Sequence, residues 1–127
     1  MKKIILFLLL FSSLAFSQTW RSQSVSIDSA DYSTDAFKIP EGFGLKSIVF
    51  PALTATTTSF KLLAGISSSS LDTLWYDDVE FSQTIDVDGC PVSLNANVVY
   101  GYQWFKVLFS VQQTADATLT IISIKQN

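Results

Sequence analysis

The stretch SIVFPALTATTTSFKLLAGISSSS, residues 47–70, carries the signals that decide the fold. An apolar run ends at Pro51, which has no N–H to donate to a β-ladder, and Phe60 begins a second apolar run. Between them, β-branched threonines keep ALTATTT extended, and serines 67–70 supply a polar tip of the hairpin type. We therefore expect a strand, a crossing over the surface and a returning strand. Nothing in this stretch requires chemistry to explain it.

The same alternation of short apolar runs and polar turns continues along the chain. Clusters of Gly, Pro, Asn, Asp and Ser separate expected strands at 22–35 (an edge strand running into a loop), 43–50, 58–65, 70–78, 79–87, 90–99, 100–111 and 117–126. No window after residue 18 has a convincing helical period of 3.6. Short strands at intervals of about ten residues predict an all-β fold, an antiparallel β-sandwich of which a jelly roll is one form.

Two expected strands show which side chains should face the core. In the strand at 100–111, one face carries Phe105, Val107, Phe109 and Val111, and the other carries Tyr102, Trp104, Lys106 and Leu108. In the strand at 117–126, Leu119 and Ile121 oppose Ile122 and Ile124. Because side chains alternate between the faces of a strand, we assign the phenylalanine face to the core.

The N-terminus, MKKIILFLLLFSSLAFSQTW, has the pattern of a secretory leader. Two lysines precede the apolar run Ile4–Phe11, and Ala15-Phe16-Ser17 offers a cleavage site that leaves Gln18 first. The alternative is a short membrane anchor, a hydrophobic helix marked by Ile4, Leu8, Phe11 and Trp20. We therefore expect a signal peptide or anchor at 1–17 and a single sandwich domain at 18–127.

Composition and charge exclude several classes of function. The 127 residues suit one domain, only 15% of them are charged, and the net charge is −3. Without the two leader lysines, six basic residues face 11 acidic ones, so nucleic-acid binding is disfavoured. There is no histidine, which excludes Ser–His and metal–His sites, and we expect no metal and no cofactor.

The single cysteine, Cys90, follows the turn signal Asp88-Gly89 and begins an apolar strand. It cannot form a disulfide within the chain, and its surroundings favour a small buried hydrophobe over a bond between chains. The preceding DVDG (86–89) lacks the later oxygen ligands and the terminal Glu of a calcium loop, so we interpret it as a hairpin turn.

A carboxylate pair is the enzymatic chemistry that the residues leave open. Asp77, Asp78 and Glu80 cluster beside Tyr76, and paired carboxylates in a cleft hydrolyse glycosides. A solvated acidic turn between two strands explains the same residues more simply, and the chain is therefore predicted not to be an enzyme.

The exposed aromatic residues are the candidates for contact with a ligand or partner. YGYQW (100–104) alternates aromatics as a carbohydrate platform does, although such residues more often pack in a core or between subunits. The candidates for contact are Trp75, Tyr76, Tyr102 and Trp104.

The order of these motifs resembles a known family. The segment LKSIVFPALTATTTSFKLLAGISSSSLDTLWYDD is similar to a β-sandwich module of phage and prophage structural proteins through Leu45, Ile48, Pro51, Ala52, Phe60, Leu74, Tyr76 and Asp77. The turn at Asp88-Gly89, with Val92 and Leu94 after it, continues the likeness. YQWFKVLFS resembles the penultimate strand of that module, and QQTADATLTIISIK resembles its ending, so residues 34–126 are covered. The resemblance implies a particle-surface or fibre-associated module with no catalytic residues.

Three hypotheses follow. The first is a non-enzymatic structural or adhesive sandwich of a phage virion (capsid, spike or fibre component), which associates with itself or with other structural subunits. Segment 22–35 would cover a sheet edge or extend a neighbour's sheet. In a membrane-containing phage, the apolar N-terminus would also hold the protein in the membrane. The second is a bacterial secreted or cell-surface module that binds glycans, and the third is a small secreted hydrolase.

The N-terminus provides a direct test of the leader. If the leader is removed, intact-mass analysis of the exported protein should give a chain that begins at Gln18, as the free or the cyclised residue. Peptides that span Ile4–Phe11 in the mature material would instead establish the anchor.

Overall fold

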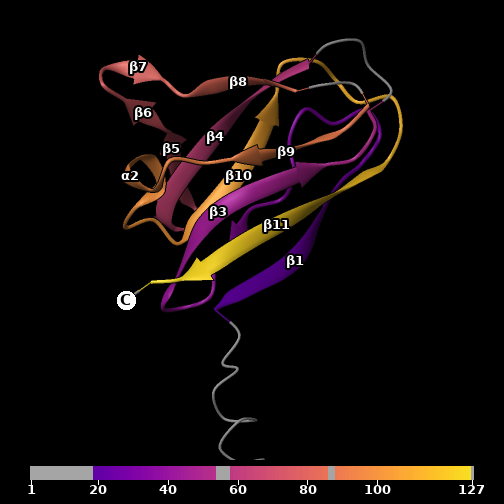
Figure 1. Ribbon diagram of the computed structural model, residues 1–127. Coiled ribbons are helices and arrows are strands. Elements are labelled where there is room, and N and C mark those ends of the chain that lie inside the picture. Colours follow the sequence, from indigo (N-terminus) through magenta and orange to yellow (C-terminus); the bar gives the residue numbers. More distant parts are fainter. Residues whose placement is uncertain (1–18, 54–57, 86–87, 127) are drawn as a thin grey trace, which may run out of the picture.

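The computed structural model describes residues 19–53, 58–85 and 88–126, and it contains two antiparallel sheets that enclose one hydrophobic core (Figure 1). The four-stranded sheet has the order β1 (Trp20–Ile27), β11 (Ala117–Lys125), β3 (Phe43–Phe50) and β9 (Cys90–Ser93). The five-stranded sheet has the order β2 (Phe37–Lys38), β10 (Trp104–Phe109), β4 (Thr58–Ser67) and β5 (Ser70–Thr73), and β8 (Ser82–Ile85) also pairs with β4. A separate hairpin joins β6 (Trp75–Tyr76) to β7 (Val79–Glu80).

The predicted all-β, antiparallel, sandwich-like fold is therefore confirmed. The predicted N-terminal helix, with Ile4, Leu8 and Phe11, lies outside the described residues. Trp20 is the first residue of β1, where it pairs with Ile124. Cleavage after Ser17 would thus leave β1 complete.

The chain repeatedly changes from one sheet to the other. β1, β3, β9 and β11 belong to the four-stranded sheet, whereas β2, β4, β5, β8 and β10 belong to the five-stranded sheet. As a result β1 and β11, at opposite ends of the chain, pair over eight residues without a register shift. The first strand therefore depends on the last one for its hydrogen bonds.

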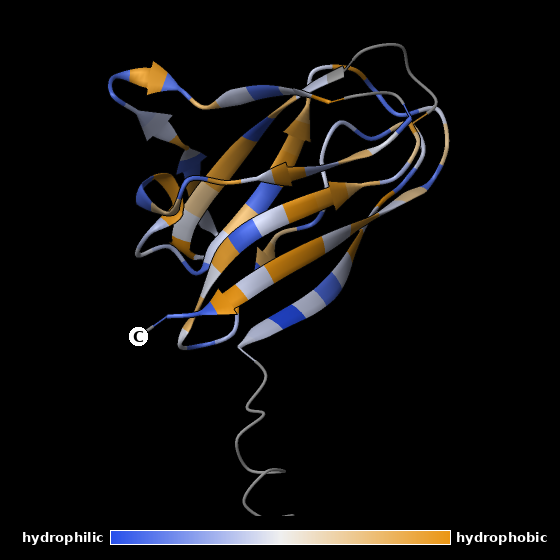
Figure 2. Cartoon of the chain, viewed as in Figure 1, coloured by the Kyte–Doolittle hydropathy of each residue, from blue (hydrophilic) through white to orange (hydrophobic). Residues whose placement is uncertain are grey.

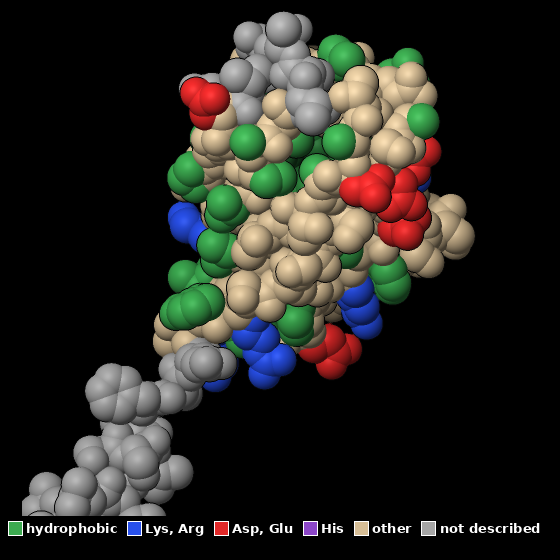
Figure 3. Space-filling model, turned by 90° about the vertical axis from the view of Figure 1, so that its right-hand side faces the viewer, with side chains coloured by type: hydrophobic (Ala, Val, Ile, Leu, Met, Phe, Trp, Pro, Cys, Tyr) green, Lys and Arg blue, Asp and Glu red, His purple; other side chains and the backbone are tan. Residues whose placement is uncertain are grey.

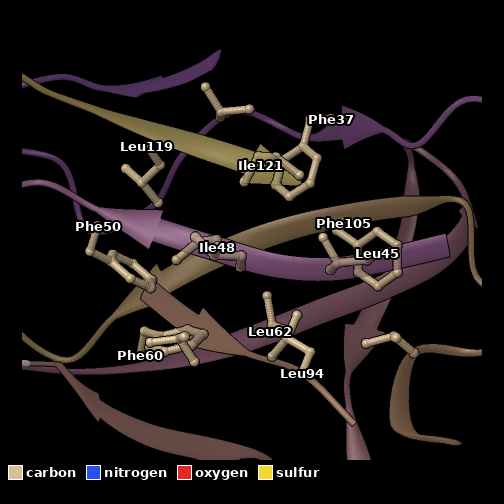
Figure 4. Close-up of a cluster of buried hydrophobic side chains, with 14 of the residues drawn as sticks. Phe37, Leu45, Ile48, Phe50, Phe60, Leu62, Leu94, Phe105, Leu119 and Ile121 are labelled. Carbon is tan, nitrogen blue, oxygen red and sulfur yellow. The ribbon is translucent and has the colours of Figure 1, made fainter. Parts of the chain in front are cut away.

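Phenylalanine rings fill the space between the sheets. Phe50 of β3 lies against Phe60 of β4, with ring centroids 4.8 Å apart, and meets Phe109 of β10 edge-on at 6.0 Å. Figure 4 shows Phe50 and Ile48 of one sheet pointing toward Phe60 and Leu62 of the other. Aromatic pairs at such separations add about 0.5–1.5 kcal/mol beyond the area that they bury.

The hydropathy of each strand agrees with its place in the fold. In Figure 2, apolar residues dominate the central strand β4, whereas β1 is largely polar and carries Val25 and Ile27 as its buried residues. In β11, Leu119 and Ile121 are buried, whereas Ile122 is half-buried and Ile124 is exposed, so the two pairs lie on opposite faces of the strand. Ser123 continues this alternation and is also buried, while the register shift beside it leaves Lys46 of β3 as the extra residue.

The expected strand at 90–99 is wrong in its second half. β9 ends at Ser93, and Ala96–Val99 forms a single helical turn, α2. The Asn95 side chain accepts a 3.0 Å hydrogen bond from the Asn97 N–H and caps this turn. Valines in the turn still bury their side chains, so their burial comes from a helix rather than from a strand.

The expected strand at 100–111 is too long at both ends. β10 spans Trp104–Phe109, and its predicted core face is confirmed for Phe105, Val107 and Phe109. Val111 was assigned to the same face, but it is 43% exposed. The last bond to β4 runs from the Ser110 N–H to the Ser59 carbonyl, and beyond it the chain turns toward Asp31, which accepts from the Gln113 N–H.

The turn at Asp88-Gly89 does not join a hairpin as predicted. β8 pairs with β4 and β9 pairs with β3, so this connection crosses between the sheets. Gly89 has φ +86°, and a Cβ there would lie 2.7 Å from the Phe50 carbonyl oxygen. Glycine is thus required both by the backbone angle and by the close approach. Cys90, half-buried and free, packs against the core.

The stability of the core can be tested within the β10 segment. Phe105→Ala removes a fully buried ring, and such truncations typically cost about 3–5 kcal/mol of unfolding free energy. Val111→Ala, a truncation at an exposed site two residues beyond the strand, should stay within about 0.5 kcal/mol. Chemical denaturation of both variants measures the difference, and equal midpoints would show that the register of β10 is wrong by one residue.

Candidate binding surface

The four aromatic residues singled out in the sequence lie in three different parts of the structure. Trp75 and Tyr76 form β6, which projects with β7 at one end of the five-stranded sheet (Figure 1). Tyr102 lies in the connection between α2 and β10, and Trp104 begins β10, opposite Gly65 of β4. No ring contact among the described residues joins these aromatics to one another. They do not build one flat platform.

The acidic cluster of the sequence lies in the β6–β7 hairpin. Asp77 and Asp78 have φ angles of 49° and 63°, which is the left-handed conformation that both central residues of a tight hairpin turn adopt. Aspartate tolerates this conformation because its short side chain bonds locally. These two carboxylates therefore occupy the exposed tip of the hairpin.

Glu80, the third carboxylate, ties the hairpin to the five-stranded sheet. Its Oε2 lies 2.7 Å from the Lys61 Nζ on β4, and the two side chains are 35% and 41% exposed. Glu80 pairs directly with Trp75 across the hairpin, so both side chains leave the same face of it. Trp75, which is 61% exposed, therefore lies on the same face of the hairpin as Glu80. This is the face that turns toward the outer surface of the five-stranded sheet.

That outer surface contains a cavity of about 260 Å³. Its lining comes from β4, β10 and the β1–β2 connection, and consists of Tyr32, Ser59, Lys61, Leu108, Phe109 and Ser110. Leu108 and Lys61 are cross-strand partners, and the Ser110 hydroxyl accepts a 3.1 Å hydrogen bond from the Ser59 N–H. The Tyr32 carbonyl accepts a 2.7 Å bond from the Phe109 N–H, which fixes this loop residue over the sheet.

The chemistry of this cavity suits a small ligand with an apolar face and a polar rim. An aromatic ring and a leucine offer apolar contact, while hydroxyl groups and an ammonium group offer hydrogen bonds. Lys61 already has an acidic partner in Glu80, so the site has little unbalanced charge to attract a free anion. Sugar rings combine these two kinds of surface.

A second cavity, of about 230 Å³, lies where the β4–β5 hairpin meets Tyr102. It is lined by Ala64, Gly65, Ile66, Ser70, Asp72, Thr73, Leu74 and Tyr102. A Cβ at Gly65 would lie 1.9 Å from the Ser70 carbonyl oxygen, so only glycine permits the two strands to approach this closely. Of the four predicted contact residues, Tyr102 lines one of these two cavities, and Trp75, Tyr76 and Trp104 line neither.

Sequence reasoning missed Tyr32 and Lys61. Tyr32 lies in a polar segment that the sequence predicts to run from an edge strand into a loop. An exposed aromatic ring in such a segment is the sequence feature that could have identified it as a site residue. Lys61 alternates with Phe60 and Leu62 and reads as an ordinary outward-facing lysine. Its pairing with Glu80 depends on how the hairpin folds back, which no local pattern indicates.

Among residues 19–53, 58–85 and 88–126, no group of three or more Cys, Asp or Glu side chains is placed to hold a metal ion. No helix in this described part of the chain has the length and apolar character needed to cross a membrane. Comparison with protein-family models and with curated proteins finds no match to this chain.

A double-mutant cycle on Lys61 and Glu80 tests the position of the hairpin. Because the pair is partly exposed, we expect a coupling free energy of about 0.2–1 kcal/mol between Lys61→Met and Glu80→Gln. Lys61→Met combined with Asp72→Asn, an acidic residue on β5, serves as the matched control and should show additive effects. A coupling near zero for the first pair would mean that β6–β7 does not fold back on the sheet.

Proposed function

We propose that the protein is a non-enzymatic jelly-roll module that acts by presenting surfaces, as a structural or adhesive component of a phage virion. The observation that carries this proposal is the strand order. One sheet has the order β1-β11-β3-β9, and it faces a second sheet with the order β2-β10-β4-β5, in which β8 also pairs with β4. The chain passes between the two sheets in the order that two successive Greek keys require. Jelly rolls of this kind build viral capsid and lectin domains.

Because a fold alone does not imply a function, the surface must support the proposal as well. The outer face of the β1–β11 pair carries hydroxyl side chains from Ser22, Ser24, Ser26, Thr118 and Thr120, and β1 has a single charged residue. Figure 3 views the molecule from the right-hand side of Figure 1. The middle of this view is mostly tan, which marks backbone and uncharged polar side chains, with hydrophobic side chains to its left and charged side chains near the margins. This face therefore has few charged groups to attract a charged substrate, and the cores of protein interfaces are likewise depleted of charged residues.

The leader and the sandwich fit the same proposal. β1 begins at Trp20, so a module that is exported, or held at a membrane by its first residues, keeps every strand of its two sheets. We accordingly place the protein in a virion, in association with a membrane where the leader is retained. A secreted or cell-surface location belongs to the alternative function.

That alternative is glycan binding, and the cavity on the outer face of the five-stranded sheet favours it. Tyr32, Lys61 and the serine hydroxyls supply the combination of aromatic and polar contacts that sugars need, and Trp75 lies on the hairpin that Lys61 holds. Glycan adhesion and a virion location are compatible, because a spike or fibre that recognises a host surface does both.

The virion role is tested by isolating particles. Particles purified on a density gradient from cultures that produce this chain should contain it at a constant ratio to the major capsid protein through successive gradients. Recovery of the protein only in the particle-free supernatant would contradict the virion role and leave the secreted module.

The glycan role is tested separately, by binding of the purified protein to an array of bacterial surface polysaccharides. Tyr32→Ala and Lys61→Ala should each weaken any binding at least about tenfold, because each removes a wall of the cavity. Tyr100→Ala removes a tyrosine that is 73% exposed and lines neither described cavity, so it is the matched control. Equal affinities of the three variants would exclude this cavity as the glycan site.

A further inference from the structure

The edges of the two sheets differ in how well they are protected against pairing with another strand. In the five-stranded sheet, the outer strands β2, β5 and β8 span only two or four residues each. In the four-stranded sheet, β9 is short and β1 spans eight residues. Long, regular edges are the ones that add strands from a second molecule.

The alternation of hydrogen bonds along β1 shows which of its backbone groups point away from the sheet. The Lys125 N–H donates to the Thr19 carbonyl at 2.7 Å, and hydrogen-bonded pairs alternate along an antiparallel ladder. Residues 21, 23, 25 and 27 therefore bond to β11, while Trp20, Ser22, Ser24 and Ser26 direct their N–H and C=O groups away from the sheet. Among the described residues, no partner occupies these outward groups.

The opposite edge of the same sheet is blocked. The Leu94 N–H donates to the Lys46 carbonyl at 2.9 Å, so Pro91 and Ser93 are the β9 residues whose backbone faces outward. Pro91 has no N–H at that position, which is a common way to protect an edge strand. β1 has no proline, no lysine and no bulge.

We propose that β1 is the interface through which the protein pairs with a second copy of itself, so that two four-stranded sheets become one continuous sheet across a two-fold axis at Ser24. This inference rests on the proposed function as an assembly module and names the surface and the partner. A two-fold axis at Ser24 sets Ser22 opposite Ser26 of the second copy. The outward N–H and C=O groups of these residues then face each other and can form hydrogen bonds between the two copies. The cross-strand pairs are then small hydroxyl side chains, which pack closely.

The outward row of side chains selects a second copy over an unrelated strand. Ser22, Ser24 and Ser26 are exposed and evenly spaced about Ser24, so this row is its own reverse. In the paired sheet it brings neither a charge nor a bulky side chain against its copy. The strand is thus complementary to itself, and the interface contains the contact between Ser22 and Ser26 twice.

A proline substitution on each edge tests which strand associates. Ser24→Pro removes an N–H that faces outward and is not used by β11, so the fold should persist while pairing fails. Sedimentation equilibrium of the purified full chain should show a reversible dimer whose dissociation constant rises at least about tenfold in Ser24→Pro. Ser93→Pro makes the same change at the outward-facing side of β9 and should leave the constant within about twofold. Thermal unfolding by circular dichroism confirms that both variants fold.

Introduced charges test the two-fold geometry without a backbone change. Ser22→Lys combined with Ser26→Lys should weaken self-association, because lysines of the two copies then lie opposite each other twice across the axis. Ser22→Lys combined with Ser26→Glu puts opposite charges at the same positions and should keep the dimer. Both chains change the same two exposed side chains, so each is the control for the other.

Several outcomes would overturn the interface. They are a wild-type protein that stays monomeric at high concentration, equal effects of Ser24→Pro and Ser93→Pro, and equal dissociation constants for the two chains with introduced charges. Recovery of the protein in purified particles alongside any of these results would leave the virion role standing without this interface. A protein that dimerises and responds to the substitutions as expected, but never occurs in particles, would contradict the virion role and leave the β1 interface standing.

Discussion

The contact between Phe50 and Phe60, one from each sheet, is the interaction on which the rest of the structure depends. Each sheet has an apolar inner face that is stable only when the other sheet covers it, and the phenylalanine rings occupy the middle of that space. Phe109 and Phe81 extend the contact to β10 and to the segment before β8. Once these rings are buried, the alternation of side chains decides which residues of every strand face outward.

The outward residues then divide the molecule into two different surfaces. The five-stranded sheet carries the Lys61–Glu80 pair, a cavity with Tyr32 at its rim and the projecting hairpin with Trp75. The β1–β11 half of the other sheet carries hydroxyl groups, and its outer edge has backbone groups that no described residue satisfies. A module of this kind offers one surface for a ligand and one edge for another subunit. The two proposals made for it therefore concern separate parts of the protein.

The connection between β1 and β11 changes how the N-terminal segment should be understood. Residues 22–35 were expected to cover a sheet edge or to extend a neighbour's sheet. The structure shows that Trp20–Ile27 covers the edge of β11 within the same chain and contributes Val25 and Ile27 to the core. Removing this segment would therefore damage the fold itself, and only its outer side remains for a neighbour.

Local pattern was sufficient for the strand at Phe43–Phe50, the hairpin tip at serines 67–70 and the core face of β10, because alternation and turn residues act over a few neighbouring positions. The sequence by itself thus determined that the chain is all-β and that Phe105 and Phe109 face the core. It did not indicate that Asp88-Gly89 crosses between sheets, that Val98 and Val99 are buried by a helical turn, or that Lys61 meets Glu80. Those features arise from pairings between residues far apart in the chain. Only the tertiary structure decides them, because the free energy of each such contact depends on what the rest of the fold places opposite it.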